Sequence, residues 1–261
     1  MSDDEVRVFE QKRGCRALHF PTALGADVPT YNIPGVTAEL KFTPDLLAGV
    51  YLGRIRKWND PELVKVNPGI ALPDAEIVVV HRSDGSGTTY VWADYLSKIS
   101  EEWRSKVGTD TSVTWPVGVG AKGNDGVTDI VRTTPNSLGY VELTYAIQNA
   151  LQGGQVRNSA GNFIRANVKS VAAAAAESGS SMPDDFRLSI TNAPGKDAYP
   201  IATFTWLLIP SKIADTGKKT AISDFLRWSL SDGQIFAEPM AYARLPQAVI
   251  TKEDEAIAQI Q

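Results

Sequence analysis

The chain has 261 residues, of which 43% are hydrophobic and 21% are charged, so it is long enough to bury the core of one large domain or two ordinary ones. Its 26 Lys and Arg residues are balanced by 30 Asp and Glu residues, and no basic run marks a nucleic-acid surface. The longest apolar stretches are far shorter than the ~18 residues that a membrane span needs. Nucleic acid is therefore not expected as a partner, and no segment is expected to cross a bilayer.

Short β-branched runs alternate with helical patterns, which predicts an α/β fold with mostly parallel sheets. Thr43, Pro44 and Asp45 have the order of an N-cap, a first-turn proline and an acid that favours the positive end of a helix. The predicted strands are 17–20, 77–80, 138–143 and 201–209. The predicted helices are 43–55, 88–99, 100–107, 125–133, 168–176 and 220–230.

The Cys and His residues indicate no metal site and no cofactor. Cys15 is the single cysteine, and its surroundings are typical of a small, partly buried strand residue. His19 and His81 fall on predicted strands, with no second ligand at metal-binding spacing. The first residues, Met-Ser-Asp-Asp-Glu, are acidic where a secretory signal is basic and then apolar, so no signal peptide is expected in this chain.

Segment 82–89, Arg-Ser-Asp-Gly-Ser-Gly-Thr-Thr, lies between a predicted buried strand and a predicted helix. Backbone N–H groups at a helix start lack internal partners, and the helix dipole adds partial positive charge there, so this turn is a candidate anion site. Arg82 offers two parallel N–H groups to an oxyanion, and Asp84 is close enough in sequence to orient it. Ser86, Gly87 and Thr88 would add hydroxyl donors and an open backbone.

Plainer interpretations of this segment stay open. Ser86 or Thr88 can be a simple N-cap, with Arg82 in a surface ion pair. A Walker P-loop is not indicated, because no lysine follows Gly87. A hydrolase nucleophile elbow is not indicated either, because Asp84 stands where that motif has glycine.

Two other stretches have weaker signals. The glycine-rich stretch 116–126 leads into a predicted helix, and we expect a loop with an Asn or Asp cap, although it could line a cleft. Segments 58–61 and 139–142 are expected to be helix-end and strand-packing features without a binding role.

The ordered motifs of the chain resemble the phosphate-binding subunit of the high-affinity bacterial phosphate ABC transporter. The resemblance runs from Met1 to about Val249 and rests on segments 46–53, 58–61, 82–88, 123–127, 138–142 and 199–201. It implies a two-lobed periplasmic-binding-protein-like fold that closes on one phosphate. By position, it implies that Arg82, Ser86, Gly87 and Thr88 are phosphate ligands and that Asp84 orients Arg82.

The chain departs from that family at its beginning. Members of the family start with a glycine-rich segment ending in Thr-Phe, a Ser-rich helix start and a Ser-Asp pair, which supply ligands from the first lobe. The sequence here resembles the family only downstream of that pair. We therefore expect a complete second lobe in 23–199, and an incomplete first lobe in 1–22 with 200–261 that exposes a strand edge.

The resemblance implies inorganic phosphate and the membrane permease subunits of an ABC importer as partners, and a periplasmic or cell-surface location for the full-length family. No enzymatic activity is expected. A phosphatase-like enzyme is one alternative, although Ser86 has no recognisable base. The other alternative is a truncated family member with weak or no ligand binding. Loss of several charge-assisted contacts, each contributing ~1.5–3 kcal/mol, would lower affinity by several powers of ten.

Overall fold

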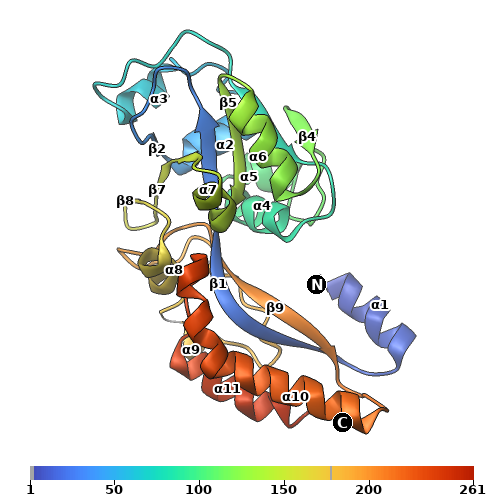
Figure 1. Cartoon of the computed structure of the whole chain (residues 1–261). Coiled ribbons are helices and arrows are strands. Elements are labelled where there is room, and N and C mark those ends of the chain that lie inside the picture. The colour runs from blue at the N-terminus through green and yellow to red at the C-terminus, as the bar shows by residue number, and fades with distance from the viewer. Residues whose placement is uncertain (1–2, 177) are drawn as a thin grey trace.

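The computed structural model describes residues 3–176 and 178–261, and it consists of two parts joined by a long strand (Figure 1). The α-helices are α1 (Asp3–Arg13), α2 (Pro44–Tyr51), α3 (Pro61–Val66), α4 (Gly87–Ile99), α5 (Glu101–Lys106), α6 (Gly123–Thr133), α7 (Leu143–Gln148), α8 (Val168–Ala174), α9 (Ser178–Ser181), α10 (Thr216–Leu230) and α11 (Gln247–Ile257), and two 3₁₀ turns are η1 (Asp232–Phe236) and η2 (Glu238–Met240). The strands are β1 (Ala17–Asn32), β2 (Lys41–Phe42), β3 (Val78–Arg82), β4 (Val119–Ala121), β5 (Ser137–Glu142), β6 (Gln152–Gly153), β7 (Gln155–Arg157), β8 (Phe163–Ile164) and β9 (Ala202–Pro210). The expected α/β class is confirmed.

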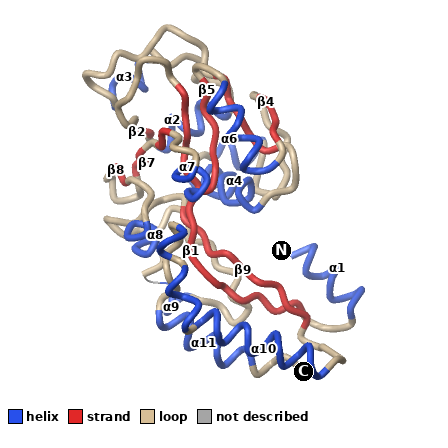
Figure 2. The backbone as a smooth tube through the Cα atoms, in the orientation of Figure 1, coloured by secondary structure: helices blue, strands red, loops and turns tan. Residues whose placement is uncertain are grey.

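Strand β1 belongs to both parts of the molecule. Its first half, from Ala17 to Ala26, pairs antiparallel with β9, and its second half, from Asp27 to Asn32, pairs antiparallel with β5. The partner therefore changes between Ala26 and Asp27. Figure 2 shows the β1–β9 ribbon running away from the remaining strands, with α10 and α11 along it.

The sequence predicted only 17–20 as a strand, but β1 covers 16 residues. Pro21 and Pro29 interrupt the strand signal, because proline cannot donate to a sheet. Pro21 lies beside a register shift in the pairing with β9, where an unmade hydrogen bond costs little. The division into 1–22 with 200–261 and 23–199 stays a prediction.

The larger part contains a mixed sheet in the order β4-β3-β5-β1-β6. Strand β3 is parallel to β4 and β5, whereas β1 is antiparallel to β5, β6 and β9. A second, small sheet has the order β2-β7-β8. The prediction of mostly parallel sheets is therefore wrong for β1, because its long neighbours β5 and β9 both run antiparallel to it.

Aromatic side chains hold the helices of the larger part on its sheet. The largest fully buried side chains include Trp58, Trp92 and Trp103. Trp92 of α4 stacks on Tyr140 of β5, with ring centroids 4.9 Å apart and planes 12° apart. Stacked aromatic pairs add to the stabilisation from burial alone, so this contact holds α4 against β5.

Three helices begin where capping residues predict. Thr43, Ser86 and Ser100 each accept a hydrogen bond from a backbone N–H in the first turn of α2, α4 and α5. Other boundaries differ from the prediction: α2 stops at Tyr51 rather than Ile55, and α10 begins at Thr216 rather than Thr220. Within 3–176 and 178–261, no helix is long and apolar enough to cross a membrane.

The smaller part contains a buried, unpaired carboxyl group. Glu253 lies on the inner face of α11 with its side chain fully buried, and neither carboxyl oxygen has a hydrogen-bond partner among the described residues. Burial raises the pKa of Glu253 from 4.5 to about 9, because a desolvated carboxylate is unfavourable. Glu253 therefore keeps its proton in the folded chain at neutral pH.

We expect Glu253→Met to stabilise the chain by about 2 kcal/mol at pH 8, because it replaces an unpaired buried polar group with an apolar one. Between pH 4.5 and pH 9 the unfolded chain releases the Glu253 proton while the folded chain retains it, so the unfolding free energy of the unmodified chain falls as pH rises. Urea unfolding at pH 5 and pH 8 measures both effects. The matched control is Glu255→Met, which changes an exposed glutamate of the same helix. Equal effects of the two substitutions at both pH values would contradict the prediction.

Candidate functional site

The candidate site is the turn between β3 and α4. Ser86 is the N-cap of α4, and its Oγ accepts a hydrogen bond of 3.2 Å from the N–H of Thr89. The N–H groups of Gly87 and Thr88 donate to no other group of the described chain. Such free amides at a helix start, together with the helix dipole, favour an anion.

Two glycines leave this turn open. A Cβ atom added to Gly85 or Gly87 would meet nothing within 4 Å, and neither residue has the positive φ that favours glycine. Packing and backbone conformation therefore do not require glycine at either position. Their effect is to leave the backbone accessible to a group from outside the chain.

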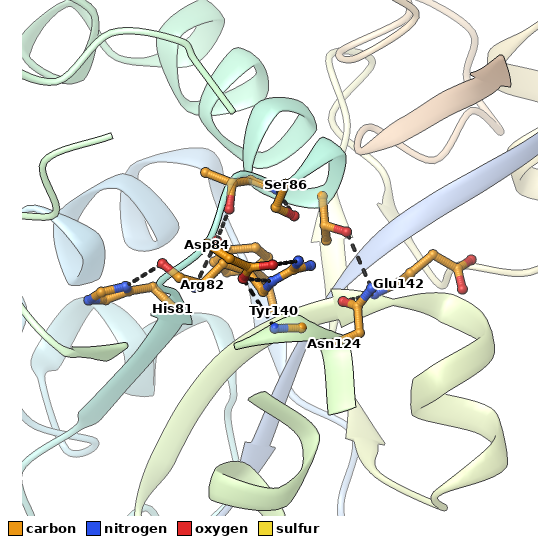
Figure 3. Close-up of polar contacts among 10 residues, drawn as sticks. His81, Arg82, Asp84, Ser86, Asn124, Tyr140 and Glu142 are labelled. Carbon is orange, nitrogen blue, oxygen red and sulfur yellow. Dashed lines mark hydrogen bonds and ion pairs between the residues drawn. The ribbon is translucent and has the colours of Figure 1, made fainter. Parts of the chain in front are cut away.

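Arg82 at the end of β3 is fixed by Asp84. Its Nε and Nη2 donate to Oδ1 and Oδ2 of Asp84 at 2.7 and 2.6 Å, and Asp84 Oδ1 also accepts from the N–H of Gly123 at 3.1 Å (Figure 3). The Arg82 side chain is 9% exposed and that of Asp84 is 31% exposed. The hydrogen bonds from Arg82 hold the pKa of Asp84 well below its usual range. The predicted pairing of these two residues is present.

Tyr140 of β5 joins the two sides of the turn. Its hydroxyl accepts from the backbone N–H of Arg82 at 3.2 Å and lies 2.8 Å from Thr89 Oγ1. The sequence assigned segment 139–142 only to packing, and it missed this contact because β5 is more than fifty residues away in the chain. Tyr140 is thus both a core residue and part of the network behind the site.

The second glycine-rich stretch also reaches the site. Helix α6 begins at Gly123 after Lys122, and no side chain caps it, so the expected Asn or Asp cap is wrong. Instead, Asn124 Nδ2 donates to Thr88 Oγ1 at 3.4 Å, and Asn124 Oδ1 accepts from the N–H of Glu142 at 3.3 Å. Asn124 therefore ties the start of α6 to both α4 and β5.

A buried and a half-buried carboxyl group, those of Asp27 and Glu142, lie where β1 changes partner. Asp27 and Glu142 are directly opposite in the β1–β5 pairing, and Asp27 is 2% exposed. Burial, followed by the charge of Glu142, raises the pKa of Asp27 well above its usual value, while Arg82 opposes this shift. The Glu142 carboxyl points away from Arg82 (Figure 3) and caps α7 by accepting from the N–H of Thr144 at 2.9 Å. No local sequence pattern predicted this pair.

All the residues expected to bind an anion lie on this turn, and none is arranged as a nucleophile. The structure brings Arg82, Ser86, Gly87 and Thr88 to one strand-to-helix turn, and Asp84 links the turn to the start of α6. Nucleophilic catalysis needs a base beside the hydroxyl. The hydrogen bond that Ser86 Oγ makes within the described chain is with the Thr89 amide, so the turn has the chemistry of an anion site.

Sequence comparison identifies a matching family model and several similar proteins. A model described as PBP superfamily domain matches residues 1–233. The chain is 44% identical over 238 residues to the phosphate-binding protein PstS of Xylella fastidiosa strain Temecula1, covering 91% of this chain and 65% of that protein. It is 40% identical over 252 residues to PstS of Pasteurella multocida, covering 96% of this chain and 73% of that protein. The chain thus spans about two thirds of the length of the Xylella relative.

The fold also matches solved structures. A high-affinity periplasmic phosphate-binding protein, solved with bound phosphate, superimposes with a TM-score of 0.77 at 21% identity, covering 98% of this chain and 76% of that one. A phosphate-binding protein from Stenotrophomonas maltophilia gives a TM-score of 0.73 at 15% identity, covering 98% and 76%. The expected periplasmic-binding-protein-like fold is confirmed, whereas the completeness of each lobe stays a prediction. By sequence, the chain belongs to the PBP superfamily and, within it, to the family of the phosphate-binding proteins PstS.

Proposed function

We propose that the β3–α4 turn forms one wall of an inorganic phosphate site, with Arg82, Ser86, Gly87 and Thr88 as ligands. The observation that carries this proposal is the combination of free α4 amides with glycines that nothing in the fold requires. Arg82 is held at the same turn by a bidentate pair with Asp84. Oriented amides, hydroxyls and a guanidinium are the donors that bind phosphate in proteins.

We further propose that phosphate bound here is passed to the permease subunits of an ABC importer, on the outer side of the membrane. The names of the PstS relatives, which are those of binding proteins, support a transport role over a phosphatase. Because the turn supplies donors from one wall, we expect the isolated chain to bind phosphate weakly. The expected Kd is well above 1 μM, the value that corresponds to a binding free energy of about −8 kcal/mol.

We expect Arg82→Lys to weaken phosphate binding by about tenfold or more, because lysine replaces a fixed fork of N–H donors with a single mobile ammonium. NMR titration with phosphate, following the amides of Gly87 and Thr88, measures the affinity at the proposed ligands. The matched control is Arg56→Lys, which alters an exposed arginine that donates to the carbonyl of Gly53 at 2.8 Å.

Three results would count against the proposal. If phosphate up to about 10 mM moved neither amide, binding tighter than the millimolar range would be absent and the site would be wrong. If both arginine variants lost affinity equally, Arg82 would have no special role. Sub-micromolar binding of phosphate by the unmodified chain would contradict the expected low affinity.

We expect Asp84→Asn to lower the free energy of unfolding by about 1–3 kcal/mol at pH 7, since it leaves the largely buried Arg82 cation without a counter-charge. The folded-state pKa of Asp84 is depressed, so the stability that it contributes is present above pH 3.8 and is lost as pH falls further. The difference in unfolding free energy between Asp84→Asn and the unmodified chain should therefore shrink in strong acid. Urea unfolding at pH 7 and pH 2.5 checks this, and a gap that is the same at both pH values would show that charge pairing is not the cause.

A further inference from the structure

Asn124, the second residue of α6, contacts two other elements with one side chain. It is half-buried, and it makes one hydrogen bond with the backbone of Glu142 at the end of β5 and one with the side chain of Thr88 in α4 (Figure 3). The direction of its amide is therefore set by β5 and α4 and not by its own helix.

The backbone N–H of Glu142 decides which way the Asn124 amide faces. This N–H group can only donate, and its nitrogen lies 3.3 Å from Asn124 Oδ1. If the amide were turned over, the Nδ2 donor would face the N–H donor with no acceptor between them. The Nδ2 group therefore points to Thr88 Oγ1, which is 3.4 Å away.

This contact determines the hydrogen-bonding role of the Thr88 hydroxyl. An amide NH₂ group has two protons to donate and accepts nothing, so Thr88 Oγ1 is the acceptor in the pair. A hydroxyl carries a single proton, and that proton takes no part in the bond from Asn124. Thr88 therefore directs its hydroxyl proton away from Asn124, where it can be donated to another group.

The other hydroxyls of the turn show which of them can act on a ligand. Ser86 Oγ also accepts from within the chain, from the N–H of Thr89 at 3.2 Å, so its proton is likewise not used in that bond. Thr89 is only 1% exposed, and its Oγ1 lies 2.8 Å from the Tyr140 hydroxyl, inside the fold. Ser86 and Thr88 thus add hydroxyl donors to the backbone N–H donors at the start of α4.

We propose that Asn124 is a positioning residue of the phosphate site, which sets the Thr88 hydroxyl as a donor to a phosphate oxygen that carries no proton. This inference rests on the proposed function, and Asn124 acts through Thr88 and not by its own contact with the anion. The distance of 3.4 Å is long for an N–H···O bond. An anion that accepts the Thr88 proton makes Oγ1 a better acceptor, so phosphate should strengthen the bond from Asn124.

A double-mutant cycle tests whether Asn124 acts through the Thr88 hydroxyl. The Gly87 amide reports phosphate affinity by NMR in the unmodified chain, Asn124→Ala, Thr88→Val and the double variant. We expect Asn124→Ala alone to weaken phosphate binding about threefold to tenfold, the effect of one net hydrogen bond. In the Thr88→Val background the same substitution should weaken binding less than about twofold, because valine keeps the shape of threonine but has no hydroxyl to position.

The matched control is Asn149→Ala. Asn149 is an exposed asparagine at the end of α7, and its Nδ2 donates to the carbonyl of Tyr145 at 3.0 Å. Its removal takes away a side-chain amide of the same kind without touching Thr88. It should leave phosphate affinity unchanged in both backgrounds.

The side-chain amide of Asn124 gives a second readout, in the unmodified chain, that does not rely on a variant folding. Its NH₂ signals should shift with added phosphate along the same binding curve as the Gly87 amide, because the bond to Thr88 strengthens when the anion binds. The NH₂ signals of Asn149 should stay in place.

The outcomes separate this inference from the proposed function. A Gly87 amide that does not respond to phosphate in the unmodified chain overturns both. If that amide responds, three results overturn the role of Asn124 alone. These are an unchanged affinity in Asn124→Ala, a loss that is equally large in the Thr88→Val background, and Asn124 NH₂ signals that stay in place as phosphate binds.

Discussion

The continuous hydrogen bonding of β1 is the constraint on which the rest of the structure depends. One strand of 16 residues supplies an edge to β9 in the smaller part and an interior position between β5 and β6 in the larger part. The change of partner at Ala26 and Asp27 fixes the relation between the two parts without a loop. Because β5 pairs with β1 on one side and β3 on the other, the position of the β3–α4 turn follows from β1.

The turn itself is held by contacts that come from three separate segments. Tyr140 presents its ring to Trp92 and its hydroxyl to Arg82 and Thr89, so the packing of α4 and the polar network share one side chain. Asp84 and Asn124 attach the start of α6 to the same turn. The proposed site would be partly preorganised, because Asp84 holds Arg82 and Asn124 holds Thr88 in the absence of a ligand.

The local parts of this arrangement are predictable from the sequence, and the long-range parts are not. Helix caps such as Ser86 act within one turn, and Arg82 and Asp84 are two residues apart, so their contacts follow from short-range geometry. The full extent of β1 was missed, because proline and glycine signals within 21–29 are local while the pairing that overrides them is not. The contacts of Tyr140 and Asn124 depend on the order of the strands in the sheet, which no single segment of the sequence encodes.

The charges around the turn decide how an anion would be held. The Arg82 cation is balanced by Asp84, and burial favours the neutral form of Asp27 at the change of partner. An oxyanion at this turn therefore meets aligned N–H and O–H dipoles rather than a large net positive charge. Dipoles act over short distances and in fixed directions, so they distinguish ligands by the number and geometry of acceptor oxygens. The affinity of the β3–α4 turn for an oxyanion would therefore rise with each further N–H or O–H donor that points at the anion. Donors from a facing surface would raise this affinity more than added positive charge would.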